Sequence, residues 1–474
     1  MTSASQAAAG GARPETGAPW RLAALSLSML LASLGTSIAN VALPSLARAF
    51  GAGFEDVQWV VLAYLLGVTA AIVGAGRLGD IVGRRRLLLA GIALFLAASI
   101  LCSAAPSLRL LVAARAAQGV GAAIMIALSM ALAGEAAPAG RTGRAMGLLG
   151  TMSAAGTALG PSLGGVLIDG FGWRSIFLLA VPPAIAAFAL VRSCLPAEPS
   201  AARGVGGRFD LPGTVLLAVT LGAYAMAMTS GGGSFGATSA AWLAASLAGL
   251  LLFLFFRARS ASTLIPRGTL GQAGLAPSLV LSLLVSAVLM TTLVVGPFYL
   301  SGALGLEAAA VGAVLSLGPA VVIVGGVPAG RAADVLGTRA ATFAGLVGIG
   351  GGCLLLSLLP IGFGVLGYCA AMVVLTLGYA VFQAANNAGA MAEAGPERRG
   401  VVSALLNLSR NVGLITGASL MGAVFAAAAG KADVAQAHPE TVAAAMRSAF
   451  AGALLLVILA LGIAVHALRS RPRG

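Results

Sequence analysis

The chain has 474 residues, of which 59% are hydrophobic and only 9% are charged, and its formal net charge is +14. So little charge excludes a soluble globular domain of this length. The positive charge lies in short arginine clusters between long apolar runs, which indicates membrane topology signals and no nucleic-acid partner. The runs do not alternate polar and apolar residues as barrel strands do. We therefore predict an all-α polytopic membrane protein embedded in a lipid bilayer.

Breaks in the apolar pattern divide the chain into fourteen predicted transmembrane helices of about 20 residues each. Residues 1–21 precede them as a disordered tail rich in alanine, serine and glycine, and residues 468–474 follow as a second tail. The predicted spans are 22–44, 57–76, 87–105, 109–133, 144–168, 174–192, 211–230, 240–257, 275–300, 308–330, 340–359, 361–391, 401–427 and 443–467. Most of the 28 lysines and arginines fall in loops on the side of the N-terminus. The positive-inside rule then places both termini in the cytoplasm.

A charged loop after the second span recurs far downstream. Gly76, Asp80, Gly83 and Arg85 are matched at the same spacing by Gly330, Asp334, Gly337 and Arg339. Glycines of the fifth span recur in the thirteenth in the same way. We therefore predict two parallel six-helix halves, 22–192 and 275–467, joined by a linker, 193–274, that holds the two extra spans 211–230 and 240–257.

The two loops are expected to act as a conformational latch between the halves. Asp80, with Arg84 beside it, and Asp334 are each expected to face the start of a helix in the other half, where the helix dipole favours an anion. The glycines allow the tight turn. The alternative is a loop that only anchors the neighbouring spans, which leaves the aspartates unexplained.

Several motifs resemble the major facilitator superfamily. The loop "GRLGDIVGRRR" (76–86) resembles its loop signature, "RAAQGVGAA" (115–123) its fourth-helix motif, and "GTALGPSLGG" (156–165) its fifth-helix antiporter signature. The stretch "ANVALP" (39–44) is similar to the first-helix motif of the fourteen-helix drug:proton antiporter branch. The resemblance implies the major facilitator fold. It also implies a functional monomer in the bacterial inner membrane that exports small amphipathic organic compounds or drugs by alternating access, in exchange for protons.

The fifth-span motif contains a row of small residues: Gly156, Gly160, Pro161, Gly164 and Gly165. Glycine at every fourth position forms a groove that admits a neighbouring backbone, and proline removes a backbone donor. We expect a rigid, well-sealed helix that moves as a unit. Ordinary close packing is the alternative.

Polar residues inside the predicted spans are candidates for the lining of a substrate cavity. They are Asn40, Tyr64, Arg115, Gln118, Gln383, Asn386, Asn387, Asn407, Arg410 and Asn411. A charge within a span indicates function by default, whereas a single amide often only joins helices. The alternatives are snorkelling to the membrane surface for Arg115 and a network with carbonyls and amides for Arg410.

All fourteen acidic residues fall in loops or near span ends. The resemblance implies an aspartate in the first span where this chain has Gly35. Arg115 therefore lacks an evident acidic partner, and we expect it to contact an anionic or strongly hydrogen-bonding group of the substrate. Glu135, at the end of the same helix, is the first candidate for proton coupling. Helix capping is its alternative role.

No pattern indicates catalysis, a bound metal or a cofactor. An intramembrane enzyme would need a nucleophile with a base, or paired acids or histidines, within the membrane. The four cysteines have no metal-ligand spacing, and a channel would need a filter or rings of charge. The nearest alternative to an exporter is an uncoupled facilitator or importer of a small organic solute.

Overall fold

The computed structural model describes residues 18–136, 142–196, 211–229, 236–259, 275–393, 399–430 and 438–469, and their regular structure is helical throughout. The first helices are α1 (Ala18–Phe50), α2 (Phe54–Val82), α3 (Arg84–Ala104), α4 (Leu108–Ala136), α5 (Thr142–Phe171), α6 (Ser175–Leu178) and α7 (Val181–Cys194). Then follow α8 (Leu211–Thr229) and α9 (Ala237–Arg259). The last are α10 (Leu275–Phe298), α11 (Ala308–Ser357), α12 (Gly364–Glu393), α13 (Arg399–Ala429) and α14 (Pro439–Arg469), with short η2 (Tyr299–Ala303) and η3 (Ile361–Phe363) turns.

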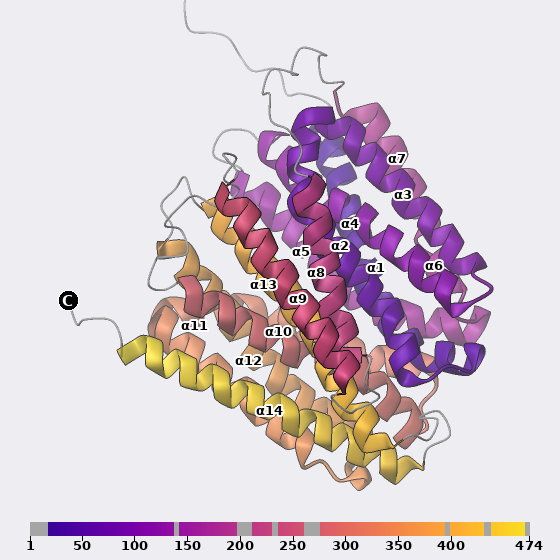
Figure 1. The fold of residues 1–474 in the computed structure, drawn as a ribbon, viewed down its shortest axis with the longest axis vertical. Helices are drawn as coiled ribbons and strands as arrows, with labels where there is room; N and C mark the ends of the chain where they lie inside the picture. The colour runs from indigo at the N-terminus through magenta and orange to yellow at the C-terminus, as the bar shows by residue number, and fades with distance from the viewer. Residues whose placement is uncertain are drawn as a thin grey trace, which may run out of the picture.

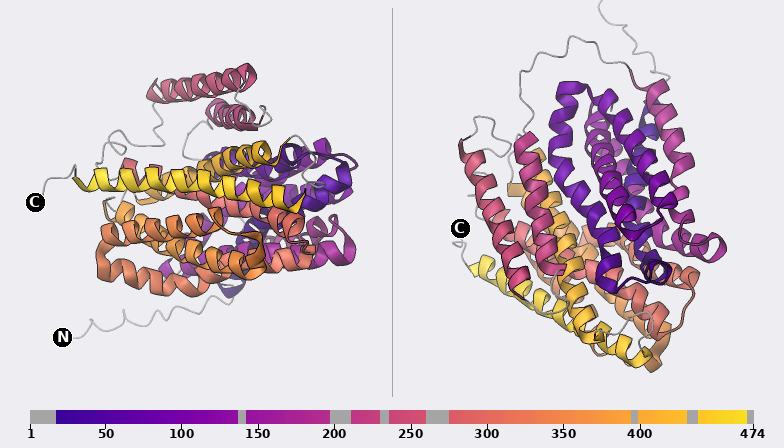
Figure 2. Two further views of the ribbon diagram at one scale, coloured as in Figure 1. Left: turned by 90° about the horizontal axis from the view of Figure 1, so that it is seen from below. Right: turned by 45° about the vertical axis from the view of Figure 1, so that its right-hand side comes forward.

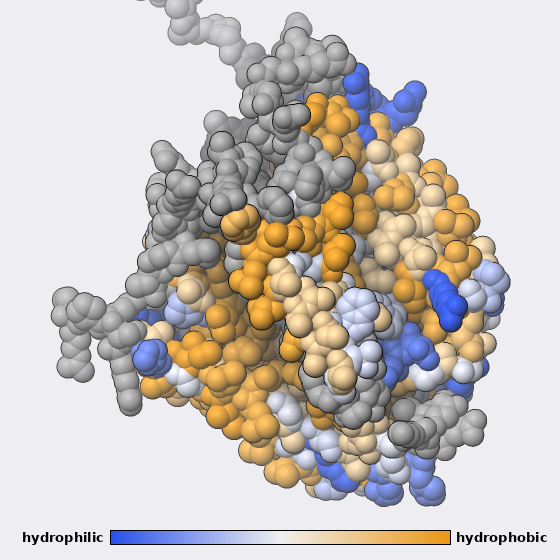
Figure 3. Space-filling view, viewed as in Figure 1, coloured by the Kyte–Doolittle hydropathy of each residue, from blue (hydrophilic) through white to orange (hydrophobic). Residues whose placement is uncertain are grey.

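Within the described residues, eleven helical stretches are long and apolar enough to cross a membrane. Hydrophobic residues form large continuous areas on the face shown in Figure 3, as expected where lipid replaces water as the solvent. The protein is therefore a multi-pass membrane protein. The expected spans 144–168 and 211–230 are not among the eleven, and the expected span 240–257 appears only as a shorter apolar helix, Ala237–Phe253. Glycine, serine and threonine lower the hydropathy of α5.

Several helices run beyond the predicted spans: α1 extends past both ends of 22–44, so residues 18–21, expected in the disordered tail, are helical. Two further differences have causes in backbone geometry. The sixth span, expected over 174–192, divides into α6 and α7 because Pro182 and Pro183 lack the N–H groups that would continue the helix. The two spans expected over 308–330 and 340–359 correspond to two apolar stretches, Ala308–Gly326 and Pro328–Ser357, which are continuous in α11 except for the break of helical geometry at Gly337 (φ 77°, ψ 153°). The turn between α2 and α3 uses Gly83 in the same way, at φ 102°. Both halves of the repeated loop thus turn on a glycine in a conformation that other residues rarely adopt.

Helices α1–α7 and α10–α14 form two groups that lie side by side (Figure 1). Corresponding helices pack in each group, α1 on α5 and α10 on α13. The repeated glycines lie in these contacts, since a Cβ at Gly156 would meet Leu34 and a Cβ at Gly413 would meet Ser286. This close approach is what a row of small residues allows in a membrane.

The helices α8 and α9 pair as a hairpin on the outside of the bundle (Figure 2). α8 packs on both α2 and α13, and the Tyr224 hydroxyl donates a hydrogen bond to Thr416 Oγ1 at 3.1 Å. The hairpin therefore covers the contact between the two groups on one side of the molecule.

Candidate functional site

The helix bundle has two ends. The terminal face is the end at which α1 begins and α14 ends, and the distal face is the opposite end, at which α1 ends and α14 begins. Groups α1–α7 and α10–α14 meet closely near the distal face. Because the two groups are closed against each other at the distal face, a cavity open to solvent is expected nearer the terminal face.

The contact of α5 with α11 closes one side of the distal face. The Asp169 carboxylate accepts hydrogen bonds from the backbone N–H groups of Ala308 (3.1 Å) and Ala309 (2.6 Å). These N–H groups begin α11, where they have no partner within the helix, so the carboxylate caps the helix and complements its dipole. One turn deeper, a Cβ on Gly165 would lie 2.9 Å from Ala309 Cα, and the backbone of Pro161 lies against Gly312. The antiporter-like motif thus lies between α1 and α11.

The contact of α2 with α13 closes the other side of the distal face. Gln58 donates a hydrogen bond from Nε2 to the Ala418 carbonyl, and Gly422 leaves room for the Gln58 side chain. Phe54 packs edge-on against Phe298, with ring centroids 4.7 Å apart, and against Phe425 at 5.0 Å. These aromatic contacts belong to a buried apolar cluster that extends across both helix groups.

A polar cavity lies in the terminal half of the second group, between α10, α12 and α13. It encloses about 150 Å³ and is lined by Ser282, Ser286, Tyr379, Phe382, Gln383, Asn386, Asn387, Met391, Leu406, Asn407 and Arg410. Asn387 and Asn407 are solvent-exposed, so the cavity is accessible from the terminal half of the molecule. A drug-sized ligand usually needs a pocket of about 300–1,000 Å³, so this cavity suits one end of such a molecule.

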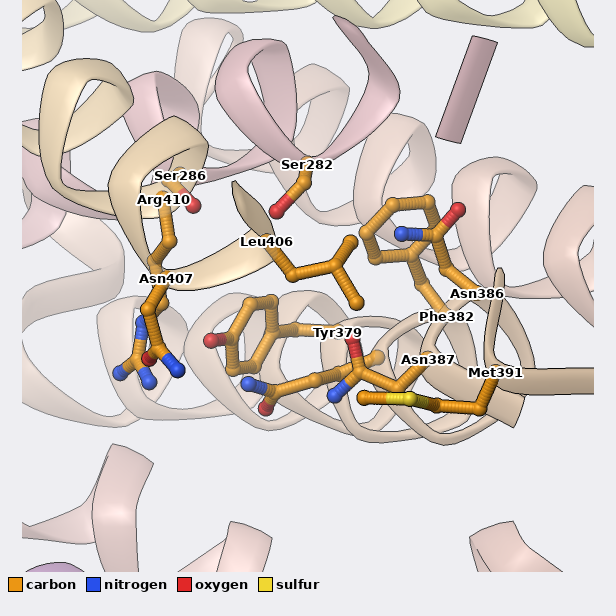
Figure 4. Close-up of a pocket in the computed structure, with 11 residues that line it drawn as sticks. Ser282, Ser286, Tyr379, Phe382, Asn386, Asn387, Met391, Leu406, Asn407 and Arg410 are labelled. Carbon is orange, nitrogen blue, oxygen red and sulfur yellow. The ribbon is translucent and has the colours of Figure 1, made fainter. Parts of the chain in front are cut away.

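Five of the ten polar residues nominated from the sequence line this cavity: Gln383, Asn386, Asn387, Asn407 and Arg410. Figure 4 shows the Arg410 guanidinium beside the Asn407 amide, with the Tyr379 hydroxyl directed toward both. Asn386 also donates a hydrogen bond to the Ser278 carbonyl (3.2 Å), which ties α12 to α10. Asn411 follows Arg410 on α13 and is half-buried, outside the lining of this cavity.

Arg115, nominated for the same cavity, lies instead in an enclosed cluster between α1, α2 and α4. It is fully buried. Its Nε donates to the Val60 carbonyl (3.0 Å), Nη1 to Gln118 Oε1 (2.5 Å) and Nη2 to the Gly35 carbonyl (3.0 Å). Its Cζ lies 4.2 Å from the centroid of the Tyr64 ring, a cation–π distance. In this conformation the guanidinium is held by protein groups, so its contact with a substrate stays a prediction for another conformation.

Gly35 explains why this cluster has no acidic partner for Arg115. A Cβ on Gly35 would lie 2.9 Å from the Tyr64 hydroxyl oxygen. That hydroxyl donates to the Ala32 carbonyl at 2.6 Å, so the ring is fixed in place. The space of an aspartate side chain is therefore occupied by tyrosine, and the carbonyl of Gly35 itself accepts from Arg115.

Gln118 and Asn40, the other cavity candidates of the first half, also make hydrogen bonds inside the protein. Gln118 donates from Nε2 to Ser99 Oγ at 2.8 Å, and its carbonyl oxygen accepts from Arg115. Asn40 is buried and donates to the carbonyls of Thr36 and Ser37 in its own helix. Gln118 therefore joins helices, which was its alternative role, whereas the Asn40 amide nitrogen bonds only within α1 and its carbonyl oxygen is buried without a partner among the described residues.

The repeated loop residues lie at the terminal face. Asp334 and Arg339 are exposed, and neither Gly76 nor Gly330 faces an atom that a Cβ would meet. Arg85 donates from Nη2 to the Arg192 carbonyl at 2.5 Å, within the first group, and Arg84 begins α3. The side chains of Asp80 and Glu135 lie outside the described part of the structure.

Sequence reasoning did not nominate Ser282, Ser286 or Tyr379 for the cavity, nor the capping role of Asp169. Serine and tyrosine are common in membrane helices and carry no spacing signal. Asp169 reaches the start of α11 only through tertiary contact between distant parts of the chain. Its position just after the glycine motif was the one sequence feature that pointed to it. Among the described residues, no group of three His, Cys, Asp or Glu side chains lies close enough to hold a metal ion.

Comparison with known proteins gives consistent matches over most of the chain. The family model described as Major Facilitator Superfamily matches residues 25–418. Multidrug resistance protein Stp of Mycobacterium tuberculosis is 32% identical over 421 residues, which cover 86% of this chain and 75% of Stp. Riboflavin transporter RibZ of Clostridioides difficile is 28% identical over 420 residues, covering 85% of this chain and 87% of RibZ.

A solved structure has a similar fold. It is a bacterial homologue of the human lysosomal transporter Spinster, in an inward-facing and unoccupied conformation. Its TM-score is 0.72 at 15% identity, covering 96% of this chain and 98% of the other. At this identity the likeness is one of fold.

Proposed function

This chain belongs to the major facilitator superfamily and is a membrane transporter, and we propose that it exports small amphipathic organic compounds, drugs among them, by alternating access. One observation carries the proposal: a polar cavity is accessible from the terminal half while the two helix groups are closed against each other near the distal face. The name of Stp supports multidrug export, whereas that of RibZ extends the candidates to a polar, hydrogen-bonding solute.

Alternating access requires the distal contacts to open after the substrate is bound. The contacts of α5 with α11 and of α2 with α13 are the surfaces that would separate. The loops around Asp80 and Asp334 would then meet the facing helix starts and latch the terminal face closed. The exposure of Asp334 in this conformation is consistent with an open latch.

The proposal includes the fourteen-helix architecture and the orientation in the membrane. Helices α5, α8 and α9 would join the eleven apolar stretches as spans, with the α8–α9 hairpin inserted between two six-helix halves. The basic loops favour cytoplasmic termini in a bacterial inner membrane, so the terminal face would be cytoplasmic. A monomer would suffice because the cavity is built from one chain.

Proton exchange is proposed at Glu135, because a carboxylate at a span end can be reached from water and can change its protonation as its surroundings change. A second candidate is uncoupled facilitation or uptake of a small organic solute. It is favoured by the absence of a carboxylate among the described residues that line the polar cavity.

Uptake into inside-out membrane vesicles tests export directly. We expect fluorescent organic compounds to accumulate in vesicles that contain the protein, and accumulation to rise when the vesicle interior is made acidic. Asn407→Leu should reduce the rate about fivefold, since one lost hydrogen bond to a bound solute is worth about 1 kcal/mol. Accumulation equal to that in vesicles lacking the protein would contradict export. Accumulation without a response to the pH gradient would favour the uncoupled alternative.

A further inference from the structure

The polar cavity has an uneven charge. Among the described residues that line it, Arg410 alone is charged, and the other polar groups are amides and hydroxyls from Ser282, Ser286, Tyr379, Gln383 and asparagines. No carboxylate is among these described lining residues. Arg410 is half-buried in this lining and has no counterion among the described residues, so the cavity carries a positive charge that favours a negative group.

Arg410 differs from Arg115 in how its donors are satisfied. Arg115 is held on three sides by Val60, Gln118 and Gly35, which use its Nε and both terminal nitrogens. The Nε of Arg410 is buried and has no acceptor among the described residues. A buried donor without an acceptor loses its hydration with no compensation, so protein groups do not satisfy the Arg410 guanidinium as they satisfy that of Arg115. The contrast points to Arg410 as the arginine whose hydrogen-bond acceptors would come from a bound ligand.

The neighbouring groups suit a planar acceptor. The Asn407 amide lies beside the Arg410 guanidinium, and the Tyr379 hydroxyl is directed toward both (Figure 4). A guanidinium presents parallel N–H groups that match the two oxygens of a carboxylate, while the amide and the hydroxyl can donate to the remaining lone pairs. One fixed cation balances one negative charge, which favours a monoanion over a phosphate dianion.

We propose that Arg410 is the specificity-determining residue of this cavity and binds the carboxylate of an amphipathic organic monoanion. This inference rests on the proposed function, because it names the substrate class of the same cavity. The cavity of about 150 Å³ holds the carboxylate end. The apolar body of the molecule would then extend out of the cavity past the exposed residues Asn387 and Asn407.

A matched set of three probes tests the proposal by binding. Pyrenebutyrate, pyrenebutanamide and pyrenebutylamine share one apolar body and carry a negative, a neutral and a positive end. Their fluorescence anisotropy is measured with the full chain in lipid nanodiscs, and empty nanodiscs correct for partition into lipid. We expect the carboxylate to bind about tenfold or more tighter than the amide, with the amine weakest. Arg410→Gln should weaken the carboxylate about tenfold and change the amide less than about threefold.

Two further variants separate recognition from folding. Arg410→Lys keeps the charge and loses the forked geometry, so its affinity for the carboxylate should fall between those of the other two proteins. Arg109→Gln, an exposed arginine at the distal end of α4, should leave all three affinities unchanged. Equal affinity of the unaltered protein for carboxylate and amide, or no loss on Arg410→Gln in a protein of unchanged melting temperature, overturns the proposal. Selective binding of the carboxylate without export in the vesicle assay would support the role of Arg410 and contradict the proposed export function.

Discussion

Gly165→Leu is expected to reduce transport by about tenfold or more while the protein still folds and inserts. A Cβ at this position already lies 2.9 Å from Ala309 Cα, so a leucine side chain has no space when α5 and α11 are closed. Overpacking of this kind costs about 1–3 kcal/mol or more. The cost falls only on the conformation with a closed distal face, because that contact separates when the distal face opens. A difference of about 1.4 kcal/mol between two states changes their ratio tenfold, so the closed conformation becomes rare.

The same substitution five residues along α5 provides the control. Gly170 is exposed, and a Cβ there would meet no atom within 4 Å. Gly170→Leu should therefore keep the transport rate of the unaltered protein in inside-out vesicles. If Gly165→Leu transports as fast as Gly170→Leu, the α5–α11 contact does not need to close during the cycle.

Arg115→Lys is expected to destabilise the protein strongly, although the charge is kept. A lysine ammonium is a compact donor and cannot reach Val60, Gln118 and Gly35 together as the guanidinium does. Losing two charge-assisted hydrogen bonds in a fully buried cluster should lower the free energy of unfolding by about 3 kcal/mol. Reversible unfolding in mixed detergent micelles measures this difference.

Arg109→Lys is the matched substitution for comparison, since Arg109 is exposed at the start of the same helix. It should change the free energy of unfolding by less than about 0.5 kcal/mol. Stability of Arg115→Lys equal to that of Arg109→Lys would mean that the enclosed hydrogen bonds contribute little. Arg115 would then be available to a substrate, as the sequence alone suggests.

The membrane class and the repeated loop could be predicted from the sequence because both depend on local pattern. Apolar runs long enough to form a spanning helix are stable in a lipid bilayer. A glycine repeated at the turn after the second span of each half indicated a tight turn there. Gly83 and Gly337 indeed adopt positive φ values. The sixth span divides at Pro182 and Pro183 because proline lacks the backbone N–H that continues a helix. This effect is also local, but a hydropathy pattern does not reveal it.

The direction of polar side chains could not be predicted in the same way. Gln383, Asn387 and Arg410 face a cavity, whereas Arg115 and the amide nitrogen of Asn40 donate to carbonyls of neighbouring helices or of the same helix. Composition and spacing are alike in the two sets. Only tertiary packing decides whether a polar residue in a span finds an acceptor inside the protein or is left for a ligand.

Accessibility of the cavity from each face of the membrane tests alternating access most directly. In a background without Cys102, Cys194, Cys353 and Cys369, a cysteine at the exposed cavity residue Asn387 is labelled with a membrane-impermeant maleimide in inside-out and in right-side-out vesicles. We predict fast labelling from the terminal face and slow labelling from the distal face, and Gly165→Leu should reverse this preference. Fast labelling from both faces of the unaltered protein, or no change on Gly165→Leu, would contradict a single cavity opened to the two faces in turn.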